Sequence, residues 1–359
     1  MTDPPTDMRL ADYRPRSQLR TTATMVSRPK YPAIDAHNHL GAAFGGEGAR
    51  RSTSKVVLAL DAAGIEAIVD LDGGWGDDLR REIARWEPLA GRVAVFAGLE
   101  YDRWAEDRAF GKREAARLRD GVAAGARGLK VWKTLGLRAR GPDGRVVAVD
   151  DARLDPLWAT AGELGVPVTI HVADPIAFFE PLDESNERWE ELQANPDWHF
   201  WPRRRGGRPK APGFPSFDEL LDDLEAVVAR HPSTTFIGAH VGCAAEDLSR
   251  VEHMLEAYPN WNIDIAARIA ELGRQPRRTR ALFERWPNRI LFGTDSGPDP
   301  AFYAVHYRFL ETLDESFPYD VDGDEPPTQG RWAIHGLGLP DDVLRQIYRD
   351  NARRLIAFD

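Results

Sequence analysis

The chain has 359 residues, of which 57 are acidic and 47 are basic, so its formal net charge is −10. This acidic balance argues against a nucleic-acid-binding protein, because such a protein needs a basic face for the phosphates. The hydrophobic content of 42% can fill a large core, which excludes global disorder. The length allows either two domains or one α/β barrel enlarged by insertions.

The single cysteine, Cys243, cannot form an internal disulfide or a Cys-rich zinc site. No stretch approaches the roughly 18 to 20 apolar residues that a membrane span requires. The N-terminal residues contain no apolar segment of the kind found in a signal peptide. We therefore expect a protein of a reducing compartment, the cytoplasm, that binds neither nucleic acid nor a membrane.

Residues 1–32 carry scattered charges and prolines, which predict an irregular N-terminal arm. Such an arm is either disordered or wraps around a neighbouring subunit. From residue 33 to residue 359, short apolar runs alternate with helical patterns, and these indicate one folded domain.

Eight short runs in this domain have the pattern of β-strands, and most are nearly continuous and apolar, as expected when both faces are buried. They are residues 33–37, 67–71, 93–99, 128–132, 166–171, 234–240, 262–266 and 289–294. Helical spacing is found at residues 54–63, 78–89, 154–164, 217–230, 247–258 and 341–356, and most of these segments end at Gly or Pro. Eight β–α units predict an α/β fold of the (β/α)8, or TIM barrel, type. The alternative, a doubly wound open sheet, lacks its glycine-rich phosphate turn.

Two connections, at about residues 173–216 and 303–330, are too long for simple turns. In a barrel, the loop that follows a strand lies at the catalytic face, and long loops there are commonly lids. The first connection, which follows strand five, is rich in Trp and Phe, so we predict a lid that closes over a substrate. The alternative is a surface excursion that mediates contacts between subunits.

Residues with metal-ligand chemistry stand at the carboxyl ends of four predicted strands. His37 and His39 end the first strand, where alternation places both side chains on one side. His171 ends the fifth strand, His240 the sixth, and Asp295 the eighth. Taken alone, each of these residues is more typical of a hydrogen-bonded residue at the barrel rim or of a helix cap. In a barrel, however, the carboxyl ends of all strands lie at one mouth, so these side chains are brought together. Histidines and a carboxylate brought together in this way suit Zn²⁺ or a similar first-row ion.

The sequence resembles the amidohydrolase superfamily, and within it the amidohydrolase-related branch of metal-dependent decarboxylases, lactonases and hydratases. The resemblance covers about residues 33–355 and rests on five segments. These are Asp35-Ala36-His37-Asn38-His39, Val168-Thr169-Ile170-His171, Gly238-Ala239-His240-Val241-Gly242, Leu291-Phe292-Gly293-Thr294-Asp295-Ser296 and Asn351-Ala352-Arg353-Arg354-Leu355. The resemblance implies that His37, His39, His171 and Asp295 hold the metal and that His240 acts on the substrate. It also implies a homo-dimer or a higher homo-oligomer.

The roles of two residues also follow from general chemistry. A divalent cation lowers the pKa of bound water from ~15.7 towards ~7. Asp295 could bind the cation through one oxygen and accept the proton of an attacking water with the other. His240 could donate a hydrogen bond to a developing oxyanion or protonate a leaving group. We therefore predict that Asp295 and His240 are the catalytic residues.

The fourth strand contains two lysines, with Lys130 and Trp132 on one face and Lys133 on the other. In binuclear members of the superfamily, a strand-four lysine is carbamylated and bridges two metals. A protonated lysine could instead hold a substrate carboxylate, or simply extend to the solvent at the rim. We favour substrate binding by Lys130, Trp132 and Lys133, with Lys130 ahead of Lys133.

Several further residues are weaker candidates. Asp174 follows the strand-five histidine, and Glu187 lies in the predicted lid, so either could contact the substrate. Asp72 and Glu100 lie near strand ends, where a carboxylate could orient a metal-bound histidine. Cys243 has no flanking signature of a nucleophile and is better explained as a small buried side chain.

Together these patterns predict a metal-dependent hydrolase in which metal-activated water attacks an amide, ester or lactone of a small carboxylated substrate. The alternative reaction is non-oxidative decarboxylation of an aromatic or unsaturated acid, and a second alternative is a catalytically silent binding protein. We expect one divalent metal ion, Zn²⁺ first and Mn²⁺ as the alternative. A second metal held by a carbamylated Lys130 is the less favoured arrangement.

Overall fold

The computed structural model describes residues 8–9, 13, 15–201, 204–205, 208–209, 214–321 and 327–358. Within the described chain, no helix combines the length and the apolar composition that crossing a membrane requires.

Parallel strands form the centre of the molecule. They are β1 (Ala33–Asn38), β2 (Ile65–Asp70), β3 (Val93–Val95), β4 (Leu129–Val131), β5 (Val168–Ile170), β8 (Phe236–Gly238), β9 (Trp261–Asp264) and β10 (Ile290–Leu291). They pair in the orders β1-β2-β3 and β4-β5-β8-β9-β10. Backbone hydrogen bonds join the two groups at both edges, from Lys130 N to Ala97 O at 2.7 Å and from Ala36 N to Phe292 O at 2.9 Å. The strands therefore close into the predicted (β/α)8 barrel.

Each barrel strand lies within one of the eight predicted runs or overlaps it. The residues of β1, β4, β5, β8, β9 and β10 are all buried, because the barrel interior covers one face and the outer helices cover the other. This burial includes Asp35, His37 and Asn38 on β1. Buried polar groups need hydrogen-bond partners, and Asp35 has them in Asn38 and Thr294.

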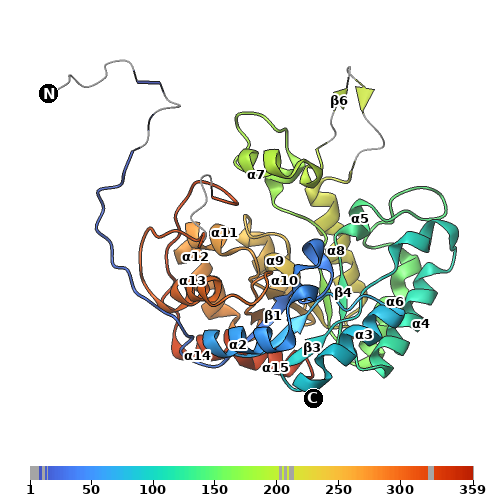
Figure 1. The fold of residues 1–359 in the computed structure, drawn as a ribbon. Helices are drawn as coiled ribbons and strands as arrows, with labels where there is room; N and C mark the ends of the chain where they lie inside the picture. Colours follow the sequence, from blue (N-terminus) through green and yellow to red (C-terminus); the bar gives the residue numbers. More distant parts are fainter. Residues whose placement is uncertain are drawn as a thin grey trace.

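Helices surround the barrel, as Figure 1 shows. The longer ones are α1 (Ala43–Arg50), α2 (Thr53–Ala63), α3 (Gly76–Trp86), α4 (Phe110–Ala123), α6 (Asp155–Leu164), α8 (Phe217–Arg230), α10 (Leu248–Ala257), α12 (Pro276–Arg285) and α13 (Pro300–Glu311). The chain closes with α14 (Asp341–Arg345), a π-helical turn (η8, Gln346–Asp350) and α15 (Asn351–Leu355). Helices α2 and α6 end at Gly64 and Gly165, whose φ angles of 78° and 66° are favourable for glycine.

The N-terminal arm contains no helix or strand within its described residues. Its last part is fastened to the barrel, because Thr24 N donates to Asp314 at 2.6 Å and Lys30 pairs with Asp341 at 2.5 Å. Thr22 is also attached, because its carbonyl oxygen accepts a hydrogen bond from Arg308 of α13 at 3.2 Å. Contact of the arm with a second subunit stays a prediction.

The two long connections contain structure of their own. Residues 173–216 include a 3-10 turn (η5, Ile176–Phe179), α7 (Trp189–Ala194), a second turn (η6, Pro196–Trp198) and the pair β6 (Arg204–Arg205) and β7 (Arg208–Pro209). Helix α7 and β6 lie on the side of the barrel opposite the C-terminus (Figure 1). The second connection begins within α13, so its irregular part starts at residue 312.

Candidate active site

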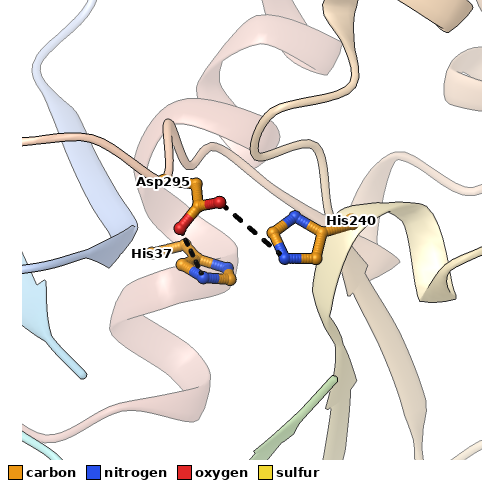
Figure 2. A group of neighbouring side chains, drawn as sticks. All are labelled: His37, His240 and Asp295. Carbon is orange, nitrogen blue, oxygen red and sulfur yellow. Dashed lines mark ion pairs between the residues drawn. The ribbon is translucent and has the colours of Figure 1, made fainter. Parts of the chain in front are cut away.

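Three residues from three strand ends converge at one mouth of the barrel: His37, His240 and Asp295 (Figure 2). Each offers a ligand atom within 4.8 Å of the other two. The Nε2 atom of His37 lies 3.4 Å from one oxygen of Asp295, and Nε2 of His240 lies 3.9 Å from the other. The β10 strand approaches closely because Gly293 has no side chain, and a Cβ there would lie 2.9 Å from the Cβ of His37.

A carboxylate at the end of β9, Asp264, positions both histidines of this group. Its Oδ2 accepts a hydrogen bond from Nδ1 of His37 at 2.8 Å, and its Oδ1 accepts one from the backbone N–H of His240 at 2.9 Å. The Nδ1 atom of His240 donates to the carbonyl oxygen of Ala266 at 2.9 Å. With both Nδ1 atoms occupied as donors, the Nε2 atoms of His37 and His240 point towards Asp295.

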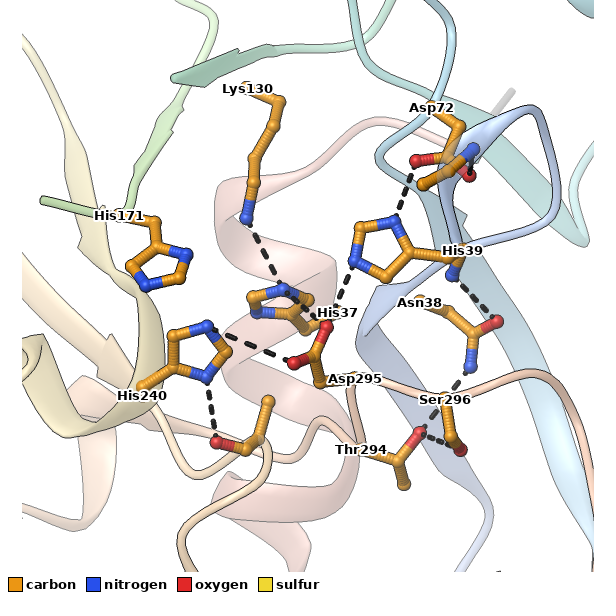
Figure 3. Close-up of polar contacts among 12 residues, drawn as sticks. His37, Asn38, His39, Asp72, Lys130, His171, His240, Thr294, Asp295 and Ser296 are labelled. Carbon is orange, nitrogen blue, oxygen red and sulfur yellow. Dashed lines mark hydrogen bonds and ion pairs between the residues drawn. The ribbon is translucent and has the colours of Figure 1, made fainter. Parts of the chain in front are cut away.

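His39 completes a second hydrogen-bonded chain beside this group (Figure 3). Its Nδ1 donates to Asp72 at 2.6 Å, and its Nε2 lies 2.9 Å from Asp295. Burial lowers the pKa of His39, but the hydrogen bonds to Asp295 and Asp72 outweigh that effect and raise the pKa to about 9. The structure thus gives Asp72 the orienting contact that the sequence suggested. Glu100, the other such candidate, instead pairs with Arg117.

His171 is buried close to the group but is turned differently. Its Nε2 faces the carbonyl oxygen of Ala173 at 3.2 Å, and its ring lies edge-on to the ring of His240, with 4.4 Å between centroids. Burial lowers the pKa of His171 to about 4 and holds that of His240 well below its ordinary value. The structure therefore brings His240, to which we assigned a substrate role, into the three-residue group. Metal binding by His171 stays a prediction.

The carboxyl group of Asp295 is the centre of these contacts. Burial alone would raise the pKa of Asp295. The neighbouring His37, together with His39 and His240, lowers this pKa by more than burial raises it, so the pKa lies well below its ordinary value. Asp295 is therefore a carboxylate, and it can bind a cation or accept a proton.

The strand-four residues lie on two sides of the group. The Nζ of Lys130 is fully buried 3.2 Å from Nε2 of His37 and 5.0 Å from the ring centre of Trp132. Burial lowers the pKa of Lys130, although Asp295 and Asp264 partly oppose this. Lys130 therefore faces the histidines, while Trp132 and Lys133 line the adjoining cavity.

That cavity has a volume of about 180 Å³ and opens directly onto the three-residue group. Its lining comes from strand ends and from both long connections. The lining residues are His37, Trp132, Lys133, His171, Asp174, Pro175, Phe178, Arg188, Glu191, Trp198, His240, Ala267, Arg268, Asp295 and Gln329. Lys133 pairs with Asp174 at 2.5 Å. Burial alone would raise the pKa of Asp174. The charge of Lys133 lowers this pKa by more than burial raises it, so the pKa lies well below its ordinary value.

The first long connection supplies one wall of the cavity. The side chains of Phe178 and Trp198 line it, as does Arg188, which is buried in ion pairs with Glu191 at 2.7 Å and with Glu271. Glu187, which we expected to contact the substrate, is instead half-exposed, pairs with Arg274 at 3.0 Å and does not line the cavity.

Sequence reasoning missed Asp264 and Arg268. Asp264 lies in the middle of the seventh predicted strand, residues 262–266, and only the structure shows that the strand ends at Asp264, as the proposed ligands end theirs. Arg268 follows in the next loop, and nothing in the sequence pattern separates it from the many other arginines. Cys243 is buried, as expected for a small apolar side chain.

The donor set fits a divalent cation. Imidazole nitrogens and a carboxylate oxygen are the ligands that Zn²⁺ and similar first-row ions prefer. Asp264 and Asp72 hold the histidines in the way that outer carboxylates do in metal sites.

A family model described as Amidohydrolase matches residues 34–358. Among solved structures, a 2,6-dihydroxybenzoate decarboxylase in complex with 2,6-dihydroxybenzoate is 18% identical, with a TM-score of 0.54 over 90% of this chain and 98% of that one. A dihydroxybenzoic acid decarboxylase from Polaromonas, with bound manganese and an inhibitor, is 17% identical, with a TM-score of 0.53 over 90% and 96% of the two chains. An amidohydrolase from Burkholderia multivorans is 15% identical, with a TM-score of 0.50 over 90% and 98%.

None of the curated proteins compared with this sequence matches it. At these identities the solved structures show a common fold. The family model, in contrast, spans nearly the whole barrel and includes every residue of the site. The chain therefore belongs to the amidohydrolase family.

Proposed function

We propose that this protein is a metal-dependent enzyme that removes CO₂ without oxidation from a small aromatic or unsaturated carboxylic acid. The observation that carries the proposal is the cavity of about 180 Å³ next to His37, His240 and Asp295. A cavity of about 150 Å³ can hold a benzene molecule. The site therefore accommodates one ring with small substituents. CO₂ is a very small leaving group, so a single-ring acid and both products of its decarboxylation fit the same cavity.

The walls of the cavity have the chemistry that a ring-bearing anion requires. Trp132, Phe178 and Trp198 provide aromatic surface, against which a flat ring can pack. Arg268 brings a cationic group without a direct carboxylate partner to the same space, whereas Lys133 and Arg188 line it in ion pairs. A carboxylate on an aromatic ring satisfies both features.

His37, His240 and Asp295 would hold the cation, with Zn²⁺ or Mn²⁺ as the proposed ion, and His39 lies against Asp295 as a further ligand candidate. When bound, the cation withdraws electron density from substrate oxygens. As the bond to the carboxyl carbon breaks, its electron pair stays on the ring carbon. The proposed source of the proton that this carbon takes up is a water molecule held by the Asp295 carboxylate and His240, which lie 3.9 Å apart, and the hydroxide that remains is neutralised by the solvent.

The test is turnover of single-ring hydroxybenzoates by metal-loaded protein in D₂O. The panel starts from 2,6-dihydroxybenzoate, because two of the solved structures with this fold are dihydroxybenzoate decarboxylases. We expect one CO₂ for each substrate consumed and one deuteron on the carbon that lost it. Asp295→Asn and His240→Asn should fold but lose turnover, whereas Glu187→Gln, outside the cavity, should keep it. A panel of single-ring acids that releases no CO₂ would count against the proposal.

Hydrolysis of a small lactone or cyclic amide is the second candidate. The feature that favours it is Asp295, whose side chain is 19% exposed and is a carboxylate, so it can contact and orient a water molecule from the solvent. A cyclic substrate also avoids the need for a second cavity, because both fragments stay in one molecule. Incorporation of one ¹⁸O from labelled water into a ring-opened product, without CO₂ release, would identify this reaction.

A further inference from the structure

We propose that Arg268 forms an anion-binding subsite in the cavity and holds a carboxylate of the ligand through its guanidinium group. Only the identification of that ligand as a substrate depends on the proposed function. Arg268 lies in the loop between β9 and α11 (Ile269–Arg274), is 7% exposed, and lines the cavity together with His240 and Asp295.

Three cationic side chains line the cavity, and Arg268 differs from Lys133 and Arg188 in its ion pairing. Lys133 is neutralised by Asp174 at 2.5 Å, and Arg188 is neutralised by Glu191 and Glu271. Within the part of the chain that the structure describes, no carboxylate forms an ion pair with Arg268. Glu191 and Glu271 bring two negative charges against the one positive charge of Arg188, so the charge of Arg268 is balanced at a distance. What Arg268 lacks among the described residues is a carboxylate in direct contact, and an anion from outside the chain can take that place.

The guanidinium group of Arg268 also has N–H groups that can donate hydrogen bonds to a ligand. A guanidinium carries five N–H groups in a planar fork, and among the described residues Arg268 uses its side chain for one hydrogen bond, from Nη1 to the carbonyl oxygen of Ala267 at 2.8 Å. The fork matches the two oxygens of a carboxylate, which can accept two parallel hydrogen bonds. A carboxylate is therefore the ligand group that fits this cation best.

The loop holds Arg268 in place before any ligand arrives. Ala267 has a φ of 55°, a left-handed conformation that is unfavourable for a residue with a side chain. In this conformation its carbonyl oxygen accepts hydrogen bonds both from Arg268 and from Nε2 of Gln329, the latter at 3.2 Å. Gln329 belongs to the second long connection and also lines the cavity. The guanidinium is thus fixed against the wall in a position that favours ligand binding.

The experiment measures binding and not turnover. Benzoate and benzamide have nearly the same shape and differ in charge, and their affinities for the metal-loaded protein can be compared by isothermal titration calorimetry. We expect the wild-type protein to prefer benzoate. In Arg268→Gln, benzoate affinity should fall by about 10- to 100-fold, because hydrogen bonds to a charged group are lost, while benzamide affinity changes little.

Arg274→Gln is the matched control, since Arg274 lies on α11, pairs with Glu187 and does not line the cavity. It should bind both compounds like the wild type. If Arg268→Gln does not fold, Arg268→Met keeps the apolar stem, removes the charge and carries the same expectation. Unchanged preference for benzoate in a folded Arg268 variant would overturn the subsite, because the preference would then arise from the metal or from another cation.

The same measurement separates this proposal from the proposed function. If no hydroxybenzoate releases CO₂ but the preference for benzoate still depends on Arg268, the reaction is wrong and the subsite stands. If CO₂ is released and the preference is independent of Arg268, the reaction stands and the subsite is wrong.

Discussion

Unfavourable backbone conformations gather where the candidate active site lies. Among the described residues, six non-glycine residues have a positive φ, and five of them lie at the carboxyl ends of β8, β9 and β10: His240, Val241, Cys243, Ala267 and Asp295. Each such residue costs roughly 1–2 kcal/mol. Specific hydrogen bonds hold these conformations, such as those from Asp295 N to His37 O at 2.8 Å and from His240 N to Asp264 at 2.9 Å. Strain that is fixed in this way is typical of functional sites.

Asp264 gives the first prediction at the scale of single residues. Both of its oxygens are used, one by the side chain of His37 and the other by the backbone N–H groups of His240 and Ala266. Asp264→Asn should therefore lower the affinity for Zn²⁺ by about 10- to 100-fold without unfolding the protein. Equilibrium dialysis measures the affinity, and circular dichroism checks the fold. Glu187→Gln is the control, and this variant should bind Zn²⁺ like the wild type. Asn262→Asp, on the same strand as Asp264, cannot serve as a control because Asn262 is buried.

His306 on α13 gives a second prediction, on the pH dependence of stability. Its side chain is fully buried, and burial lowers its pKa to about 4 although Nδ1 contacts the carbonyl oxygen of Phe302 at 2.9 Å. Between the unfolded pKa of about 6.5 and this folded value, the unfolded chain binds a proton that the folded chain does not. Stability contributed by neutral His306 is therefore lost as the pH falls through that window, by an amount on the order of 3 kcal/mol.

Urea unfolding at a series of pH values between 7.5 and 4 tests this sign. His306→Leu should flatten the fall in the free energy of unfolding over the window. Equal slopes for His306→Leu and the wild type would show that His306 does not contribute.

At the scale of elements, the boundaries that the sequence predicted well are those with local chemical causes. Helix α8 was predicted at residues 217–230 and is found there, because Ser216 begins it and Pro232 prevents its continuation. The capping box is complete: Ser216 accepts from Glu219 N at 3.2 Å, and Ser216 N donates to the Glu219 carboxylate at 2.8 Å. The structure inside residues 173–216 was not predicted, since its short helices depend on contacts with the barrel.

The cap of α8 provides a prediction at this scale. Ser216→Ala removes one partner of the capping box at the point where the first long connection returns to the barrel. The free energy of unfolding should fall by about 1 kcal/mol, measured by chemical denaturation. Ser216→Asp retains a good cap and should stay close to the wild type. A loss of equal size in Ser216→Asp would show that the hydroxyl has another role.

At the scale of the whole molecule, the barrel could be predicted because its strands are short, apolar and separated by clear helix ends. Barrel topology then places strand ends together, which is why His37, His240 and Asp295 could be grouped from the sequence alone. The relative roles of His171 and His240 could not be predicted, since they depend on a left-handed backbone at His240. Arg268 could not be singled out, because its burial results from packing between distant loops.

The last prediction concerns the metal and the stability of the whole barrel. The site joins β1, β8 and β10, which are far apart in the sequence, so an ion bound there should stabilise the folded chain more than the unfolded chain. At an ion concentration of about 100 times the dissociation constant, the gain is about 2.7 kcal/mol, which for a chain of this length raises the melting temperature by roughly 4 °C. Calorimetry with and without a chelator measures this shift. It should be present in the wild type and in Glu187→Gln, and absent in Asp295→Asn and His37→Asn. A shift of the same size in Asp295→Asn would place the stabilising ion elsewhere, because removing a carboxylate from the centre of the three-residue group must weaken an ion held by that group.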